Sequence, residues 1–573
     1  MHLRQLKSAL YVLLGGIVLT ACDDDDPVSP TLQPPVIDEV TVGGTSATVI
    51  FTPSSTAESH SVEISAEGES PQSQDAPSGT TSVTFDDLSE GVAYTAQVVA
   101  TRGSDTATSE PVVFSLGGFV LVDSDIEEDV TWTNDQIYLL RGPIFVGRDI
   151  DGDDGLAVTL TIEPGTTILG DANAPSGTRG SFLVVTRGSQ LIADANADEA
   201  DPNVRPDPDN VIVFTSSQPR GNRARGDWGG IIINGRAPTN AGDEAAGEGD
   251  SGFFGGTDEA DDSGILRGVR VEFAGDRVTA TDELNGIAFQ GVGAGTTVDY
   301  VQIHYNVDDG TEPFGGTVSQ THMVMTGIGD DSFDGTDGYR GFIQFGVVQM
   351  RGDDGDKAFE LSTNGDNPDT ATPRSSALIA NVTAVGAEQG EIQGPTLHQG
   401  LNLREGSNWR VYNTILAGMQ RGPVSVDGST QPYAQNYLDG STDPDEISLF
   451  ANSLVWRSSD LSGFDQTFVE HAASNNMIVA DADELLPASA FDYGTLESPP
   501  NLIPSAMPGG YTAQDVSGIT DGLVLPTDGR SLMATDYAGA VAPGTALEDA
   551  WYYGWTVWAV DGSDSRPNAE EAN

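Results

Sequence analysis

The chain has 573 residues, and its 87 Asp and Glu outnumber its 25 Lys and Arg to give a formal net charge of −62. So large a negative charge argues against nucleic acid and anionic lipid surfaces as partners, because both are polyanions. The 38% hydrophobic content argues against wholesale disorder, while 69 glycines and 31 prolines indicate many turns. Short runs of Val, Ile, Thr and Phe between Gly, Asp and Asn predict an all-β chain.

The first 21 residues resemble a bacterial lipoprotein signal peptide. Arg4 and Lys7 precede an apolar stretch that ends in small residues just before Cys22, the only cysteine of the chain. The stretch is far shorter than the roughly 20 apolar residues that span a bilayer. We therefore expect removal of residues 1–21 and lipidation of Cys22. The protein would then contact the outer membrane through this lipid anchor alone.

Four aspartates follow the cysteine within an acidic, proline-containing segment at 22–34, whose composition predicts a tether. The acidic run resembles the surface-export signal of Bacteroidetes-type lipoproteins, which implies display on the cell surface. In enteric bacteria, an aspartate directly after the cysteine instead resembles an inner-membrane retention signal. The leaflet that carries the protein therefore depends on the organism.

Residues 35–116 predict a β-sandwich, because four strand patterns separated by turn residues fit the length of one such domain. The segment from Leu88 to Tyr94 resembles the corner motif of fibronectin type III domains, although Glu90 and Val92 depart from it. This resemblance implies a spacer or binding module, and we assign it no catalytic activity.

From residue 117 onward the sequence changes to longer repeating blocks. Three blocks, which begin at Val301, Met323 and Val347, each contain an aspartate pair. Three further apolar segments each contain one asparagine, namely Asn381, Asn413 and Asn452. The repeats predict a right-handed parallel β-helix over residues 117–460, with equivalent residues about 4.8 Å apart and asparagines stacked at the bends.

A solenoid also suits the size of this region, because it extends one core by adding turns instead of thickening a globule. Two or three further sandwiches are the competing interpretation, which the irregular strand spacing disfavours.

Several segments between residues 117 and 560 resemble a family of exported β-helix lipoproteins and secreted proteins found mainly in Bacteroidetes-type and marine bacteria. The matching segments begin at Leu160, Ile212, Ser263, Glu283 and Trp551. The resemblance implies the β-helix fold and export. It implies no activity, since members of the family are largely uncharacterised.

The aspartate pairs are predicted to share one corner of adjacent turns. Two unit charges about 5 Å apart oppose each other by roughly 3 kcal/mol at an effective dielectric constant near 20. Protonation, splaying into water or a bound cation must relieve this repulsion. Ca²⁺ takes six to eight oxygen ligands in flexible geometry. We therefore predict a Ca²⁺ site formed by Asp308, Asp309, Asp330, Asp331, Asp353 and Asp354 and completed by Glu312, Asp334, Asp337, Asp356 and Glu360. Solvated turn aspartates without a metal are the alternative.

A second candidate for Ca²⁺ is the sequence from Asp149 to Gly155, in which Asp149, Asp151 and Asp153 alternate with other residues. The spacing is typical of the first half of a calcium loop. The glutamate that closes an EF-hand loop is missing, so an acidic turn is the alternative.

Enzyme motifs are largely missing from the sequence, which contains no phosphate-binding P-loop, no Gly-x-Ser-x-Gly and no His-Glu-x-x-His. Arg351 is a candidate base for a polysaccharide lyase, but arginine stays protonated near neutral pH and we interpret it as a counter-ion. His304, His322 and His398 lie in or near apolar strand patterns, and we interpret them as packed residues.

Residues 461–560 predict a C-terminal extension of the β-helix and its cap. The aromatic run that begins at Trp551 is predicted to cover the last open turn. A platform that stacks against sugars is the alternative role of these rings. Residues 561–573 predict a disordered tail.

These features together predict a surface-anchored envelope protein that binds polysaccharide or other envelope proteins without catalysis and takes Ca²⁺ as its cofactor. The alternative is an extracellular polysaccharide lyase or glycoside hydrolase that uses the clustered carboxylates.

Overall fold

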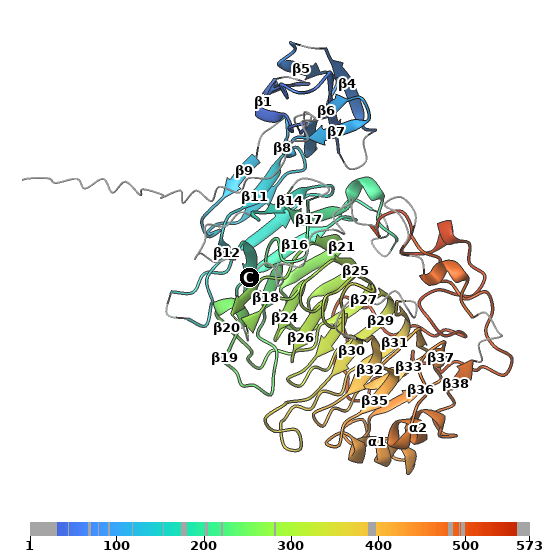
Figure 1. Cartoon of the computed structure of the whole chain (residues 1–573). Helices are drawn as coiled ribbons and strands as arrows, with labels where there is room; N and C mark the ends of the chain where they lie inside the picture. Colours follow the sequence, from blue (N-terminus) through green and yellow to red (C-terminus); the bar gives the residue numbers. More distant parts are fainter. Residues whose placement is uncertain are drawn as a thin grey trace, which may run out of the picture.

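A computed structural model of the chain describes residues 31–558 except 44, 67–69, 78, 90–91, 117–118, 153, 173–179, 200, 202–203, 219–221, 280–281, 388–396, 480–484, 492 and 494–498. The predicted signal peptide, Cys22, Asp153 and the predicted tail lie outside the described residues. Among the residues that are described, no helix is long and apolar enough to cross a membrane. The described chain forms a small β-sandwich followed by a long β-solenoid (Figure 1).

The N-terminal domain is a sandwich of two antiparallel sheets at one end of the molecule (Figure 1). One sheet contains β1 (Val36–Gly43), β2 (Ser46–Thr52) and β5 (Ser82–Phe85). The other contains β3 (Ser59–Ser65), β4 (Gln72–Ala76), β6 (Tyr94–Arg102), β7 (Asp105–Thr108) and β8 (Val112–Phe114). Alternating side chains of both sheets, such as Val62 and Val98, fill the core between them. The predicted β-sandwich is thereby confirmed.

The predicted corner motif has a clear role where the chain passes from β5 in one sheet to β6 in the other. Tyr94 is buried, and its hydroxyl oxygen accepts a hydrogen bond from the backbone N–H of Ser89 at 2.9 Å. Its ring stacks on Phe114 with the centroids 5.5 Å apart. The tyrosine therefore fixes the crossing between the sheets, as in a tyrosine corner.

The solenoid consists of parallel strands, each paired with the equivalent strand of the next turn. One sheet, the large sheet, has 17 strands. They are β9 (Phe119–Val122), β10 (Val130–Trp132), β11 (Ile137–Leu140), β13 (Thr159–Ile162), β14 (Thr167–Gly170), β16 (Gln190–Asp194), β17 (Ile212–Ser216), β21 (Gly264–Glu272), β25 (Thr297–His304), β27 (Ser319–Thr326), β29 (Phe342–Gln349), β31 (Leu378–Val385), β33 (Arg410–Tyr412), β34 (Ile415–Ala417), β36 (Leu449–Ala451), β37 (Leu454–Trp456) and β38 (Met477–Val479).

The second sheet of the solenoid, the nine-stranded sheet, is also parallel. Its strands are β12 (Pro143–Val146), β15 (Phe182–Val185), β18 (Ile231–Asn234), β24 (Ile287–Gln290), β26 (Thr311–Phe314), β28 (Phe333–Gly335), β30 (Lys357–Leu361), β32 (Gln399–Leu403) and β35 (Gly422–Val426). Two short antiparallel hairpins project from the turns, β19 (Ala245–Ala246) with β20 (Phe253–Phe254) and β22 (Arg277–Thr279) with β23 (Asp282–Glu283). The predicted right-handed parallel β-helix is confirmed, and the pairing of β37 with β38 extends it beyond residue 460.

The strands of the large sheet bend at one column of residues with left-handed backbone. In β21, β25, β27, β29 and β31 the bend lies inside the strand, whereas in the later turns it separates two short strands. The register aligns Gly268, Tyr300, His322, Phe345, Asn381, Asn413, Asn452 and Asn475, all with positive φ. Asparagine tolerates this conformation better than most residues do. The prediction that Asn381, Asn413 and Asn452 stack at the bends is therefore confirmed.

Two short helices close the far end of the solenoid, α1 (Gln431–Leu438) and α2 (Gly463–Glu470) (Figure 1). Phe468 and Val469 of α2 are fully buried in the solenoid core. Four single turns of 3₁₀-helix lie at Pro208–Asn210, Glu248–Asp250, Ala488–Phe491 and Leu547–Asp549.

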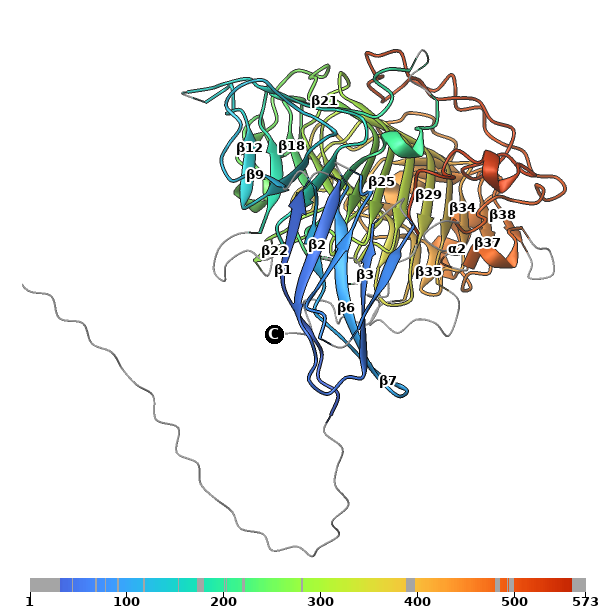
Figure 2. The ribbon, with the colours of Figure 1, turned by 90° about the horizontal axis from the view of Figure 1, so that it is seen from above.

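Residues 501–558, which we name the side strap, run back along the outside of the large sheet (Figures 1 and 2, red). Backbone carbonyls along the strap accept hydrogen bonds from side chains of successively earlier turns. Asn413 donates to Gln514 at 2.8 Å, Gln344 to Met533 at 2.9 Å, and Gln302 to Val557 at 2.6 Å.

The aromatic run that begins at Trp551 lies in the side strap, so its predicted position over the last turn was wrong. Trp555 and Trp558 do not cover the last turn; they pack with Val324 and Val347, apolar residues on the outer face of the large sheet. The physical reason is that this face carries apolar side chains that need cover, whereas α2 already closes the end.

Candidate metal site on the nine-stranded sheet

The aspartate pairs lie at the turns that lead into neighbouring strands of the nine-stranded sheet. Thr311 of β26 pairs with Phe333 of β28, and Phe333 pairs with Phe359 of β30. This register places Asp309 beside Asp331, and the backbone N–H of Asp331 donates to Asp309 Oδ1 at 2.9 Å.

The predicted alignment of Asp353 and Asp354 with the other two aspartate pairs was wrong. Asp331 lies beside Lys357, whose backbone N–H donates to Asp331 Oδ1 at 2.7 Å, so Asp356 and not Asp353 or Asp354 continues the column. The residues in register are 22 apart in the first step and 26 apart in the second, because the turn before β30 is longer. Asp353 instead forms an ion pair with Arg225 at 2.9 Å, and the backbone carbonyl oxygen of Asp354 lies 3.2 Å from His398 Nε2.

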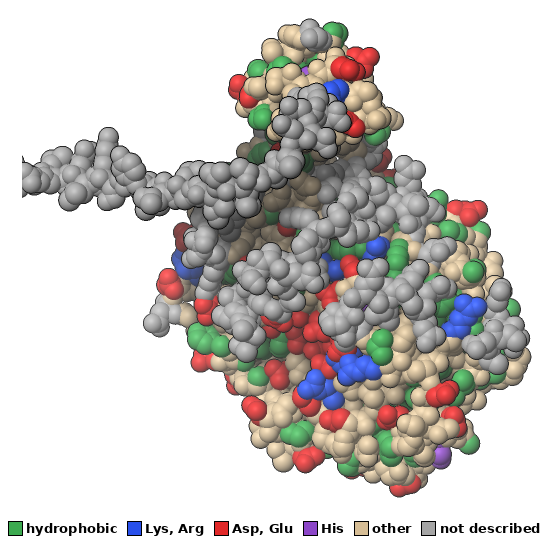
Figure 3. All heavy atoms as spheres, viewed as in Figure 1, with side chains coloured by type: hydrophobic (Ala, Val, Ile, Leu, Met, Phe, Trp, Pro, Cys, Tyr) green, Lys and Arg blue, Asp and Glu red, His purple; other side chains and the backbone are tan. Residues whose placement is uncertain are grey.

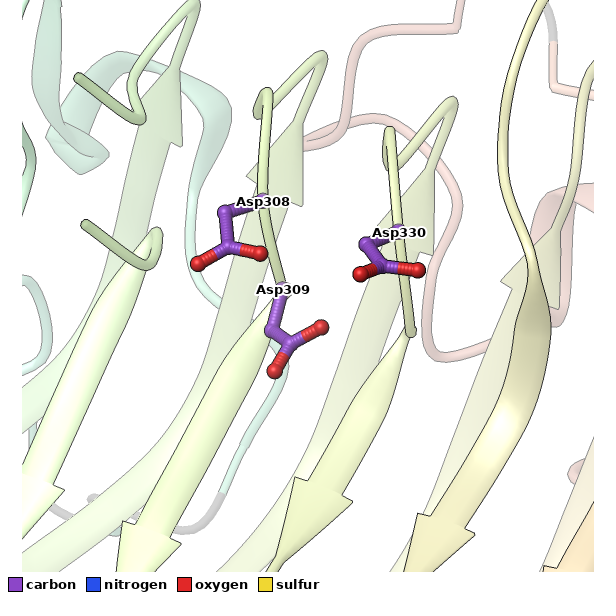
Figure 4. A group of neighbouring side chains, drawn as sticks. All are labelled: Asp308, Asp309 and Asp330. Carbon is purple, nitrogen blue, oxygen red and sulfur yellow. The ribbon is translucent and has the colours of Figure 1, made fainter. Parts of the chain in front are cut away.

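Three overlapping groups of carboxylates result, and we name them together the acidic column. In each group the oxygens lie within 4.8 Å of one another. Figure 4 shows the group of Asp308, Asp309 and Asp330 at two adjacent turns. The other groups are Asp309, Glu312 and Asp334, and Asp330, Asp331 and Asp356.

Glu312, Asp334 and Glu360 belong to the column because they occupy the outward positions of β26, β28 and β30. Side chains alternate along a strand, and the neighbouring Phe333 and Phe359 point into the core with their rings stacked at 5.6 Å. Acidic side chains accordingly gather on this face of the molecule, with Lys and Arg at one edge (Figure 3).

Three carboxylates of the acidic column, those of Asp309, Glu312 and Asp331, are buried although the column faces outward. Asp309 is 5% exposed and Asp331 only 2%. Burial, reinforced by the like charges of neighbouring carboxylates, raises the pKa of Asp309, Glu312, Asp331 and Asp334 well above the ordinary range. Burial likewise raises the pKa of Asp330 to about 6. Protons or a cation are needed to neutralise such a cluster near pH 7.

One end of the acidic column contains its own cations. Lys357 Nζ lies 3.2 Å from Asp331 and 3.0 Å from Glu360, and it also contacts Asp356. Arg404 pairs with Glu360 at 2.8 Å. Although burial alone would lower the pKa of Lys357, the charges of Asp331 and Glu360 raise it above its ordinary value. Lys357 is therefore a fixed positive charge.

At the end of the acidic column opposite Lys357, the residue in register is an amide, Asn285. Asn285 precedes β24 by two residues, as Asp309 precedes β26, so the two are neighbours in register. Its Nδ2 donates to Glu312 at 2.8 Å and to Glu248 at 3.0 Å. Asn285 is 1% exposed, and among the described residues its Oδ1 finds no hydrogen-bond partner. An uncompensated amide oxygen beside carboxylates is a ligand set typical of Ca²⁺.

The sequence did not reveal Asn285 or Glu248 as part of this site. The available signal was the repeated Asn-Gly or Asp-Gly before a strand, at Asn285 and Asp309. Glu248 belongs to a turn far away in sequence, and only the fold brings it to the column.

The other predicted ligands are not brought together with the acidic column. Asp149 receives hydrogen bonds from Arg187, with Nε at 2.8 Å, and Asp151 lies 3.3 Å from Arg236 Nε. These carboxylates therefore face arginines, and Asp153 lies outside the described residues. Asp337 accepts from Asn364 at 3.4 Å, and burial raises its pKa to about 6.

The histidines and Arg351 are packed against other side chains. His304 is buried, with Nδ1 2.7 Å from Thr326 Oγ1, and burial holds its pKa well below the ordinary value. His322 stacks on Tyr300 with centroids 4.3 Å apart. The guanidinium of Arg351 lies over the ring of Tyr493 at 4.2 Å.

Residues 124–482, which include the entire acidic column, match the family of pectate-lyase like beta helix domains. The chain belongs to this family. The pectate-lyase-like β-helix therefore forms the greater part of the protein, and the family links it to polysaccharides. No curated protein matches the chain.

Several solved structures share local similarity with the pectate-lyase-like protein. Pectate lyase PelI from Erwinia chrysanthemi, solved in complex with tetragalacturonic acid, is 9% identical and covers 64% of this chain and 89% of its own, with a TM-score of 0.13. The FN3 domain of human collagen XX is 11% identical and covers 16% of this chain and 99% of its own, with a TM-score of 0.14. A structure described as a myokine is 22% identical and covers 15% and 97%, with a TM-score of 0.13.

Proposed function

We propose that the protein is a non-catalytic polysaccharide-binding protein of the cell surface, held to the outer membrane by lipid at Cys22, and that its acidic column binds Ca²⁺. The observation that supports this proposal most directly is the set of partly buried, outward-facing carboxylates with an uncompensated Asn285 oxygen at the end opposite Lys357. Bound Ca²⁺ would present a positive site to the acidic groups of a polysaccharide on an otherwise acidic protein. Other envelope proteins are the alternative partners.

Binding without cleavage is favoured by the state of the basic side chains. A lyase needs a neutral base that takes a proton from the sugar. Lys357 and Arg404 touch the column, and nearby carboxylates hold both as cations. Arg351 is stacked between the rings of Tyr305 and Tyr493.

We expect the purified protein to retain one or more acidic polysaccharides on an affinity gel in Ca²⁺, and to release them in EDTA, without forming products. Polygalacturonate and alginate are suitable probes. New unsaturated ends, detected by their ultraviolet absorbance, would contradict the proposal.

The alternative function is a polysaccharide lyase or glycoside hydrolase, and membership of the pectate-lyase-like family is the observation that favours it. Product formation that disappears in Asp309→Ala and Asp331→Ala would establish this alternative. If these variants only lower the melting temperature in Ca²⁺, the column is structural.

We expect Ca²⁺ to bind the chelator-treated protein and to raise its melting temperature, because a dication relieves the repulsion between buried carboxylates of the folded state. Asp309 belongs to two of the three carboxylate groups. Asp309→Asn should therefore weaken Ca²⁺ binding about tenfold or more, which isothermal titration calorimetry measures.

The matched control is Asp86→Asn in the sandwich, where the carboxylate is exposed. It should leave Ca²⁺ binding unchanged. Equal loss of affinity in both variants would indicate that Ca²⁺ only screens the overall charge.

A further inference from the structure

A cavity of about 320 Å³ lies at the first turns of the nine-stranded sheet, away from the acidic column. Phe145 of β12 and residues at the ends of β15 and β18, Thr186 and Asn234, form one side of it. Ser251 to Phe253, the segment that leads into β20, form the other side. The cavity is thus an open depression between the sheet and the β19–β20 hairpin.

The aromatic side chains of this hairpin are divided between the core and the cavity. Phe254 is buried against Phe314, with ring centroids 6.2 Å apart, and this contact anchors the hairpin to the sheet. The preceding residue, Phe253, lines the cavity and is 52% exposed. A large apolar ring left open to water beside a cavity is an informative exception to burial, because it offers a surface for an apolar partner.

One polar side chain that lines the cavity, Asn234, is incompletely hydrogen-bonded. Asn234 Nδ2 donates to the Ser251 carbonyl oxygen at 2.9 Å, whereas its buried Oδ1 has no partner among the described residues. The hydroxyl group of a ligand can donate to this oxygen.

The charged groups around the cavity are already paired. Arg187 binds Asp149 at 2.8 Å, and Arg148 binds Glu127 at 2.5 Å. The Asp125 carboxylate accepts the backbone N–H of Phe145 at 3.1 Å. Among the described residues that line the cavity, the one arginine is already paired with a carboxylate, so the chemistry of the cavity suits an uncharged ligand better than an anion.

We propose that this cavity is a subsite for one residue of a neutral polysaccharide. A sugar ring has an apolar C–H face, which would pack on Phe253, and hydroxyl groups at its edge, which would reach Asn234 and Thr186. The volume lies at the low end of the roughly 300–1,000 Å³ typical of ligand pockets, which matches one sugar unit better than a longer segment. The inference rests on the proposed function only in that the ligand is a polysaccharide.

The test is binding of neutral hexasaccharides to the full chain in EDTA, measured by isothermal titration calorimetry. Cellohexaose, xylohexaose, mannohexaose and laminarihexaose are the probes. We expect at least one of them to bind, and Phe253→Ala to weaken that binding about tenfold or more through loss of the stacking surface. Since Phe253 is exposed, the variant should keep the circular dichroism spectrum and melting temperature of the parent. Phe119→Ala, an exposed phenylalanine on β9 in the large sheet, is the matched control and should bind as the parent does.

Failure to bind all four probes, or equal binding by the parent and Phe253→Ala, overturns the inference. Tetragalacturonate that binds in EDTA in their place, and depends on Phe253, also overturns it. Because EDTA removes the contribution of the acidic column, loss of Ca²⁺-dependent retention by Asp309→Asn leaves this test unaffected.

Discussion

Replacement of Lys357 by methionine is expected to lower the free energy of unfolding of the EDTA-treated protein by about 3–5 kcal/mol at pH 7. The ammonium group is buried and contacts Asp331, Asp356 and Glu360, so its removal leaves these carboxylates without their shared counter-charge. Methionine keeps the volume of the side chain, and the loss therefore reports on charge. Chemical denaturation followed by tryptophan fluorescence measures it.

Arg421→Met is the matched control, because Arg421 also contacts Asp356 but its side chain is 47% exposed. An exposed ion pair contributes about 0–1 kcal/mol, so this variant should unfold nearly as the parent does. Similar losses in both variants would show that Lys357 has no special role in the column.

Glu312 and Glu360 are expected to respond to pH in opposite ways. Burial and the charge of Asp334 raise the pKa of Glu312. Its contribution to stability is therefore present below its ordinary pKa and is lost as pH rises through the raised value. Burial alone would also raise the pKa of Glu360, but Lys357 and Arg404 lower it. Its contribution is present above its ordinary pKa and is lost as pH falls through the lowered value.

In EDTA at pH 7, Glu312→Gln should consequently raise the melting temperature and Glu360→Gln should lower it. Thermal scans between pH 4 and pH 8 check both signs, and the gain from Glu312→Gln should shrink towards pH 4. Added Ca²⁺ should reverse the gain, because the variant lacks a ligand. If both variants changed the melting temperature in the same direction, the two ends of the column would be electrostatically alike.

The repeats of the sequence were sufficient to predict the solenoid. Equivalent positions of successive turns need the same backbone conformation and the same kind of side chain, so similar residues recur at them. Asn381, Asn413 and Asn452 recur because each bend needs a left-handed backbone. Tyr300, His322 and Phe345 occupy the same column with less suitable side chains, and sequence reasoning assigned them no such role. Their ring stacking became visible only in the structure.

The candidate site was predicted in part, and the errors have local causes. Asp308 to Asp331 were placed in adjacent turns correctly because the 22 residues between the two aspartate pairs make one full turn. Asp353 and Asp354 were misplaced because the next turn is longer, and an aspartate pair carries no information on the register of its strand. Asn285, Glu248 and Phe253 join their sites through turns and a hairpin, whose contacts depend on the folded shape and not on spacing.

The side strap has a consequence for the way the molecule comes apart. A stack of repeats that touch only their neighbours can unravel one layer at a time from either end. Here a single segment is tied to Asn413, Gln302 and Arg205, which lie in widely separated layers. Unfolding of an end layer must therefore break hydrogen bonds to the side strap, which also binds layers in the middle of the solenoid. Mechanical pulling on the protein should meet one large force peak instead of a series of small ones.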